Sequence, residues 1–236
     1  MQLRKIILFC LPYGGGSAAV FNSWRKFLDK NIEIRPIEIA GRGSRLEEPF
    51  YQNSIEAIND VYKMIEPLID NSPYALFGHS LGCLLTYELL IRAMDNKLKE
   101  PKHVFFSGLN PPHLDERSSD IHLLPDKEFD IIVQKLGGTP EEFFENKELK
   151  DIFIPILRND YRLYENHKYS NIKKKFNFDI SVLNGIDDSS TSIENVNQWS
   201  KYTSKECKIY NFKGGHFFIS ECQSSVLNVI NLNLIK

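Results

Sequence analysis

The sequence lacks three features, and each absence excludes a class of function. No apolar run is long enough for a membrane-spanning helix, so a membrane is not an expected partner. The chain has 29 basic and 31 acidic residues but no basic block interleaved with aromatics, so nucleic acid is not expected either. The four cysteines show no CxxC or CxxH spacing, and no histidine–carboxylate cluster has the spacing of metal ligands. We therefore expect a cytoplasmic protein with reduced thiols and no metal.

Strand and helix patterns alternate over most of the 236 residues. Short apolar runs bounded by Gly and Pro predict buried strands, whereas apolar residues three or four positions apart predict helices. The predicted strands are 5–10, 32–39, 74–77, 104–107, 179–183 and 207–212. This order is typical of a mostly parallel sheet with helices on both faces, so we expect an α/β fold.

Two of the predicted helices carry details that the structure can test. Ser17 is expected to cap a helix that places Phe21 and Phe27 on one apolar face. The helix that begins at Ser54 is expected to close near Pro67, because proline cannot continue the hydrogen-bond ladder.

Between residues 111 and 169 the alternation stops, and only helical patterns occur. No linker or internal repeat divides the rest of the chain. We therefore expect a single domain over 1–236 with a helical insertion at 111–169.

The pentapeptide GHSLG at 78–82 joins a predicted strand to a predicted helix. It matches G-x-S-x-G, in which a sharp turn lifts the serine above the strand ends and the glycines allow close backbone approach. The alternative is a structural turn whose serine only caps the helix. The flanking strand and helix are the context that the motif requires, so Ser80 is the predicted nucleophile.

A serine hydroxyl needs a base to take its proton. His216 follows two glycines after the last predicted strand, where the α/β-hydrolase order Ser…Asp/Glu…His places the base. The acid should follow an earlier strand, and GIDD offers Asp187 and Asp188, between which spacing alone does not choose. The other histidines are expected to be structural or on the surface: His79, His103, His113, His122 and His167.

Acyl transfer also needs two N–H donors for the developing oxyanion. One is expected to be the N–H of Leu81, the residue after the nucleophile, and the other should come from the loop LPYGGGS at 11–17. This loop lacks the GxxxxGK[ST] and spaced GxGxxG patterns, which argues against a nucleotide site.

With these residues placed, the chain resembles the type II thioesterases of the α/β-hydrolase fold, stand-alone editing enzymes of nonribosomal peptide and polyketide synthesis. The resemblance covers nearly the whole chain and rests on LFCLPYGGGSAAVFNSW, IAGRGSRLEEP, FGHSLG, LGGTPEE, ILRNDYRLYENHKY, GIDD and FKGGHFFI. Ala40 stands where the family usually has proline, and Gly14 stands at an alanine position. The match implies Gly14 as the second oxyanion donor and Asp188 as the catalytic acid.

The resemblance implies a Ser80–Asp188–His216 triad that hydrolyses acyl groups from the 4′-phosphopantetheine arm of acyl or peptidyl carrier proteins, as in antibiotic or siderophore assembly. It implies no cofactor of the chain's own, because the phosphopantetheine belongs to the partner. The insertion 111–169 would be a lid, whose aromatics would line the acyl pocket or fill the lid core. A monomer is expected.

Three questions stay open at this point. A general carboxylesterase or an acyltransferase would use the same triad and fold, and a hydrolase-like binding protein would keep the fold without turnover. Arg42 and Arg45 would either help to hold the pantetheine or carrier, or form a structural turn with salt bridges. The lid rather than the triad is expected to set the preferred acyl chain length.

Overall fold

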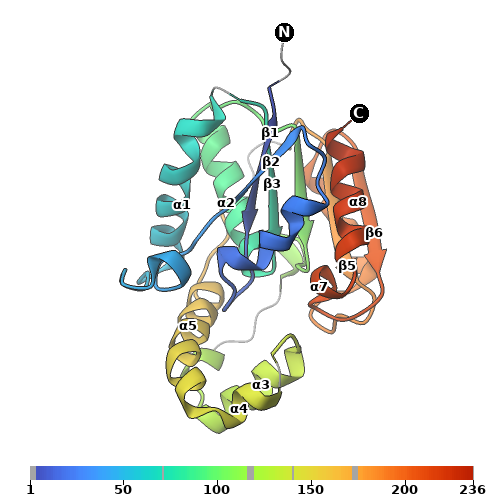
Figure 1. The fold of residues 1–236 in the computed structure, drawn as a ribbon. Helices are drawn as coiled ribbons and strands as arrows, with labels where there is room; N and C mark the ends of the chain where they lie inside the picture. Colours follow the sequence, from blue (N-terminus) through green and yellow to red (C-terminus); the bar gives the residue numbers. More distant parts are fainter. Residues whose placement is uncertain (1–3, 71, 116–119, 140, 172–174, 236) are drawn as a thin grey trace.

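The computed structural model describes residues 4–70, 72–115, 120–139, 141–171 and 175–235 and contains a six-stranded parallel sheet (Figure 1). The strand order across the sheet is β2-β1-β3-β4-β5-β6. The strands are β1 (Ile6–Leu11), β2 (Ile32–Pro36), β3 (Tyr74–His79), β4 (His103–Ser107), β5 (Ile180–Gly185) and β6 (Cys207–Phe212). Each predicted strand is present, although β2 ends three residues before the predicted boundary. The α/β prediction is confirmed.

Helices cover both faces of the sheet. Side chains of a strand alternate between the two faces, and in these buried strands both sets are largely apolar, so each face packs against helices. Phe9 of β1 packs in the apolar cluster that contains residues of α1 (Ser54–Ile69) and α2 (Leu81–Asp95). Its neighbours Leu8 and Cys10 pack in the second cluster, with α8 (Gln223–Leu234). Figure 1 shows α1 and α2 on one side of the strands and α8 on the other.

Of the two helices with testable details, one differs from expectation. Ser17 does cap the first one, since its side chain accepts a hydrogen bond from Ala19 N–H, but the element is a 3₁₀ helix over Ala18–Lys26. It ends before Phe27, which is 52% exposed, so the prediction that Phe27 shares an apolar helix face with Phe21 is wrong. The helix α1 ends at Ile69, two residues after Pro67, so the prediction that it closes near this proline is confirmed.

The insertion consists of α3 (Asp126–Leu136), α4 (Glu141–Glu145) and α5 (Lys147–Glu165), with two short 3₁₀ turns, Pro112–Leu114 and Ile121–Leu123, before them. These helices share an apolar cluster of their own, formed by Phe129, Val133, Phe143 and Ile154. In Figure 1 they lie beyond the end of the sheet toward which the parallel strands run. Residues 116–119 and 140 of the predicted insertion lie outside the described residues.

The rest of the described chain contributes further short elements. They are the 3₁₀ turns Gly43–Arg45 and Gln198–Tyr202 and the helices α6 (Ile193–Asn197) and α7 (Phe218–Glu221). The sequence patterns do not predict α7. Within the described residues, no helix combines the length and the apolar character needed to cross a bilayer.

Candidate active site

Ser80 occupies a strained turn between β3 and α2. Its backbone angles are φ 54° and ψ −117°, outside the regions that a non-glycine residue normally adopts. A Cβ on Gly78 would lie 2.2 Å from the carbonyl oxygen of Gly82, and one on Gly82 would lie 2.2 Å from that of Leu11. Both glycines of the motif are therefore required by backbone contact, as a nucleophile elbow demands.

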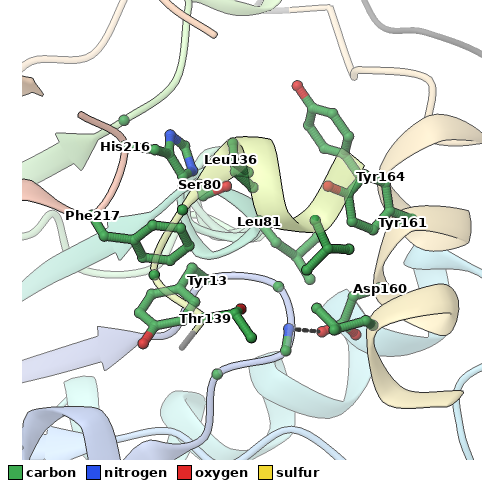
Figure 2. A pocket seen from close by; sticks show the side chains of 18 of the residues that line it. Tyr13, Ser80, Leu81, Leu136, Thr139, Asp160, Tyr161, Tyr164, His216 and Phe217 are labelled. Atoms are coloured by element: carbon green, nitrogen blue, oxygen red, sulfur yellow. Dashed lines mark hydrogen bonds between the residues drawn. The ribbon is translucent and has the colours of Figure 1, made fainter. Parts of the chain in front are cut away.

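His216 lies in the loop after β6, and its Nδ1 is 2.7 Å from Oδ2 of Asp188, in the loop after β5. Both side chains are buried. His216 and Ser80 line the same cavity, and Figure 2 shows the imidazole beside the Ser80 side chain. Because the Nδ1–H donates to the carboxylate, the other ring nitrogen, Nε2, is left to accept a proton.

The structure separates the two neighbouring acids. Asp187 is exposed, and its carboxylate accepts a hydrogen bond from the N–H of Gly214 at 3.3 Å. Asp188 is the acid that contacts His216. Burial tends to raise the pKa of Asp188, but its bonds to His216 and Ser190 outweigh burial and lower that pKa. Asp188 therefore remains ionised at neutral pH.

Ser190 belongs to this group of side chains, although the sequence patterns do not identify it. Its hydroxyl donates to Oδ1 of Asp188 at 2.6 Å, its N–H donates to the same oxygen at 2.9 Å, and its Oγ is 3.2 Å from Nδ1 of His216. A serine two residues after an aspartate is a common turn signal, so its presence does not mark a functional site. Only the fold reveals its contact with His216.

The two predicted oxyanion donors, Gly14 and Leu81, also line the cavity. Leu81 is the first residue of α2, so its N–H has no acceptor within the helix. In the loop after β1, the next two N–H groups are engaged elsewhere: that of Gly15 donates to Asp160 at 2.7 Å, and that of Gly16 donates to the Tyr13 carbonyl at 2.9 Å. The roles of Gly14 and Leu81 stay predictions.

Of the described residues that line the cavity, His216 is the one histidine. His79 is fully buried; its Nδ1 is 2.8 Å from Ser107 Oγ, and its ring lies 5.0 Å from that of His216. Burial, and secondly the nearby His216, lower the pKa of His79 well below its ordinary value, so it stays neutral. The remaining histidines contact structural partners: His103 with Ser181, His113 with Tyr202, His122 with Glu165, and His167 with Glu88 and Ser54.

The cavity has a volume of about 460 Å³ and a largely apolar wall. The insertion supplies much of this wall, through side chains that include Val133, Leu136, Leu157, Phe143, Phe153, Tyr161 and Tyr164. Of the lid aromatics, Phe129 instead lies fully buried in the apolar cluster of the insertion, and Phe144 packs against that cluster. The aromatics of the insertion thus divide between the cavity wall and the apolar cluster of the insertion.

The two arginines of the IAGRGSRLEEP segment are engaged in ion pairs. Arg42 is buried and pairs with Asp160 of α5, and Arg45 pairs with Glu48 and Asp60. These contacts favour the structural role over direct binding of the pantetheine. Within the described part of the chain, no group of three or more His, Cys, Asp or Glu side chains is arranged to hold a metal ion.

Comparison with known proteins identifies the family. Residues 6–233 match the family described as Thioesterase domain. The solved structure of ClbQ, from the colibactin NRPS/PKS pathway, is 37% identical with a TM-score of 0.92 and aligns over 98% of this chain and 97% of its own.

Two curated relatives extend over most of their own length as well. The gramicidin S biosynthesis protein GrsT of Aneurinibacillus migulanus is 33% identical over 94% of this chain and 86% of its own. A protein named linear gramicidin dehydrogenase LgrE, from Brevibacillus parabrevis, is 32% identical over 98% and 88%. With a nucleophile elbow and a histidine–aspartate pair at the end of a parallel sheet, the chain belongs to the thioesterase family.

Proposed function

We propose that the chain is a type II thioesterase that hydrolyses acyl groups from the 4′-phosphopantetheine arm of carrier proteins in nonribosomal peptide or polyketide synthesis. The observation that carries the proposal is the His216–Asp188 pair next to Ser80 at a largely apolar cavity. The pathway assignment is supported by the similarity to ClbQ, a protein from the colibactin NRPS/PKS pathway. The chain needs no cofactor of its own, because the carrier brings the pantetheine.

In the first half of the reaction, Ser80 Oγ attacks the thioester carbonyl carbon while its proton passes to Nε2 of His216. The carbonyl electrons move to oxygen, and the N–H groups of Leu81 and Gly14 stabilise this oxyanion. The intermediate then collapses: the carbon–sulfur bond breaks, and the departing thiolate takes the proton from His216. Asp188 stabilises the imidazolium formed in between and keeps the ring oriented.

In the second half, a water molecule attacks the acyl-enzyme and gives a proton to His216. The bond between the acyl carbon and Ser80 Oγ breaks, the serine regains its proton from His216, and the carboxylic acid leaves. The insertion 111–169 acts as a lid, because its side chains form much of the cavity wall. A lid of this kind orients the acyl chain and excludes water from the first step.

The name of LgrE does not indicate a second candidate function. A nicotinamide-dependent dehydrogenase binds its dinucleotide with a spaced GxGxxG, and the glycine run of this chain lacks that spacing. The loop instead lies against α5 and lines the cavity that contains Ser80. This arrangement favours acyl chemistry over hydride transfer.

The test is deacylation of a peptidyl carrier protein loaded with acetyl or longer acyl groups, followed by mass spectrometry. We expect release by the wild type, loss of release in Ser80→Ala and His216→Ala, and normal release in Ser23→Ala, which removes an exposed hydroxyl. A matched oxygen ester separates a thioesterase from a general carboxylesterase, and labelling of Ser80 by a fluorophosphonate separates an enzyme from a binding protein. Normal turnover by Ser80→Ala would refute the proposal.

A further inference from the structure

A buried ion pair joins α5 of the lid to the segment that follows β2. Nη1 of Arg42 lies 2.6 Å from Oδ2 of Asp160 and Nη2 lies 2.6 Å from Oδ1, and the two side chains are only 2% and 1% exposed. Burial alone would lower the pKa of Arg42, but the charge of Asp160 and its hydrogen bond outweigh burial and raise it. Arg42 therefore keeps its positive charge in this buried position.

The same pair also holds the glycine loop. Oδ2 of Asp160 accepts the N–H of Gly15 at 2.7 Å, which Figure 2 draws as the dashed line, and Nη1 of Arg42 donates to the Gly16 carbonyl at 3.2 Å. A Cβ on Gly15 would lie 2.5 Å from Leu157, also of α5, and the φ of Gly15 is +78°. Loop and lid helix therefore pack without space between them, and glycine is required at this position.

These contacts fix the two peptide planes that surround Gly14. The Tyr13–Gly14 plane carries the predicted oxyanion donor, the N–H of Gly14, and its carbonyl accepts the N–H of Gly16 at 2.9 Å. The Gly14–Gly15 plane carries the N–H that Asp160 accepts. Since a peptide unit is planar and its N–H and C=O point in opposite directions, fixing one group orients the other.

We infer that Arg42 and Asp160 are positioning residues for the reaction: the lid carboxylate, held by the arginine, sets the orientation of the Gly14 N–H toward the oxyanion. The inference rests on the proposed acyl transfer at Ser80. It means that α5 is part of the catalytic framework as well as part of the pocket wall. The two residues are 118 positions apart in the sequence and meet only in the folded chain.

The test must separate this role from a purely structural one. Replacement of a buried ion pair by apolar residues of similar size often preserves stability. We therefore expect Arg42→Met/Asp160→Leu to keep a near wild-type midpoint of urea unfolding. Its kcat should fall about 10- to 100-fold, with KM changed little. This loss is smaller than the roughly 100- to 1,000-fold cost of losing a whole oxyanion donor, because the Gly14 N–H is misoriented rather than removed. Asp160→Asn, which keeps the shape but removes the charge, is expected to lower kcat in the same way.

A second readout measures the oxyanion site directly. A trifluoromethyl ketone analogue of the thioester binds as a hemiketal, in which Ser80 Oγ bonds to the carbonyl carbon, the carbonyl oxygen becomes the oxyanion, and the serine proton moves to His216. We expect the inhibitor to bind at least tenfold more weakly to Arg42→Met/Asp160→Leu and to Asp160→Asn than to the wild type. The matched amide, which forms no oxyanion, should bind as it does to the wild type.

The control is a second ion pair of the insertion. Lys150 of α5 pairs with Asp130 of α3, outside the cavity, and Lys150→Met/Asp130→Leu should leave kcat and inhibitor affinity unchanged. A folded Arg42→Met/Asp160→Leu variant with kcat within twofold of wild type would overturn the inference; should that variant not fold, the same result with Asp160→Asn would overturn it. Ser80→Ala, measured alongside, shows separately whether the proposed function holds.

Discussion

The charge balance of the cavity predicts which acyl groups the enzyme accepts. Asp160 is the one carboxylate among the described residues of the cavity wall, and Arg42 already neutralises it. A positively charged acyl terminus would therefore lose its hydration without gaining a counter-ion. We expect hydrolysis of neutral, apolar acyl groups and strong discrimination against acyl groups that carry a buried ammonium.

A matched pair of substrates isolates this effect. The octanoyl group and the 7-aminoheptanoyl group have the same length, but the second ends in an ammonium where the first ends in a methyl. A cavity of about 460 Å³ has room for a chain of this size. An unpaired charge taken out of water costs several kcal/mol even after relaxation of the protein. With about 3 kcal/mol as a low value, kcat/KM should differ by about 100-fold or more.

The assay compares kcat/KM for the two groups on the same carrier protein, with a variant pair as the control. Leu136 lines the cavity (Figure 2), and Leu136→Asp and Leu136→Asn introduce side chains of equal size that differ in charge. Leu136→Asp should reduce the ratio of kcat/KM for the octanoyl group to that for the 7-aminoheptanoyl group at least tenfold, whereas Leu136→Asn should leave this ratio unchanged. A wild-type enzyme that hydrolyses both groups within about fivefold of each other would refute the reasoning.

Three further predictions concern single residues. Ser190→Ala removes a hydroxyl hydrogen bond to Asp188, and such a bond to a charged group contributes about 1.5–3 kcal/mol. We therefore expect kcat to fall about tenfold in Ser190→Ala, whereas Ser190→Thr should stay active. Equal rates for the alanine variant and the wild type would contradict this. The buried Glu88 has a lowered pKa, because its bonds to neighbouring groups outweigh burial, so its stabilising effect is complete above about pH 4.5 and is lost at lower pH. Urea unfolding from pH 3 to 7 should therefore show that Glu88→Gln loses less of its free energy of unfolding at acid pH than the wild type does. Parallel plots of this free energy against pH for the two proteins would contradict the prediction. Gly82→Ala should lower the free energy of unfolding by about 1–3 kcal/mol, since its Cβ would meet the Leu11 carbonyl, and an unchanged unfolding midpoint would contradict that contact.

The sheet was predictable from the sequence because its strands are buried on both faces and appear as short apolar runs. The elbow was predictable for a similar reason: a strand, five residues and a helix are contiguous, and the glycines are required by contacts that the motif itself implies. The position of His216 after the last strand follows from the order of elements. The type and the end of the helix after Ser17 were less predictable, as Phe27 shows, because packing outweighs local preference there.

The pairings around the site were not predictable, since they join residues that are far apart in the chain. Arg42 has 31 acidic residues as candidate partners, and nothing local selects Asp160. The choice between Asp187 and Asp188 depends on which side of the loop faces His216, which spacing does not encode. Ser190 lies in an ordinary turn sequence and gains significance only through its distance from the imidazole.

The contacts of α5 also determine which part of the lid can move. Besides the bonds of Asp160, the helix is attached to the body of the protein by Arg162, which donates to the Tyr51 carbonyl at 2.8 Å. To swing outward, α5 would have to break a buried ion pair and displace the glycine loop. The helices α3 and α4 pack mainly on the apolar cluster of the insertion itself. If the proposed function holds, we therefore expect opening for the acyl-pantetheine arm to begin at α3 and α4, while α5 stays in place and keeps the glycine loop in position.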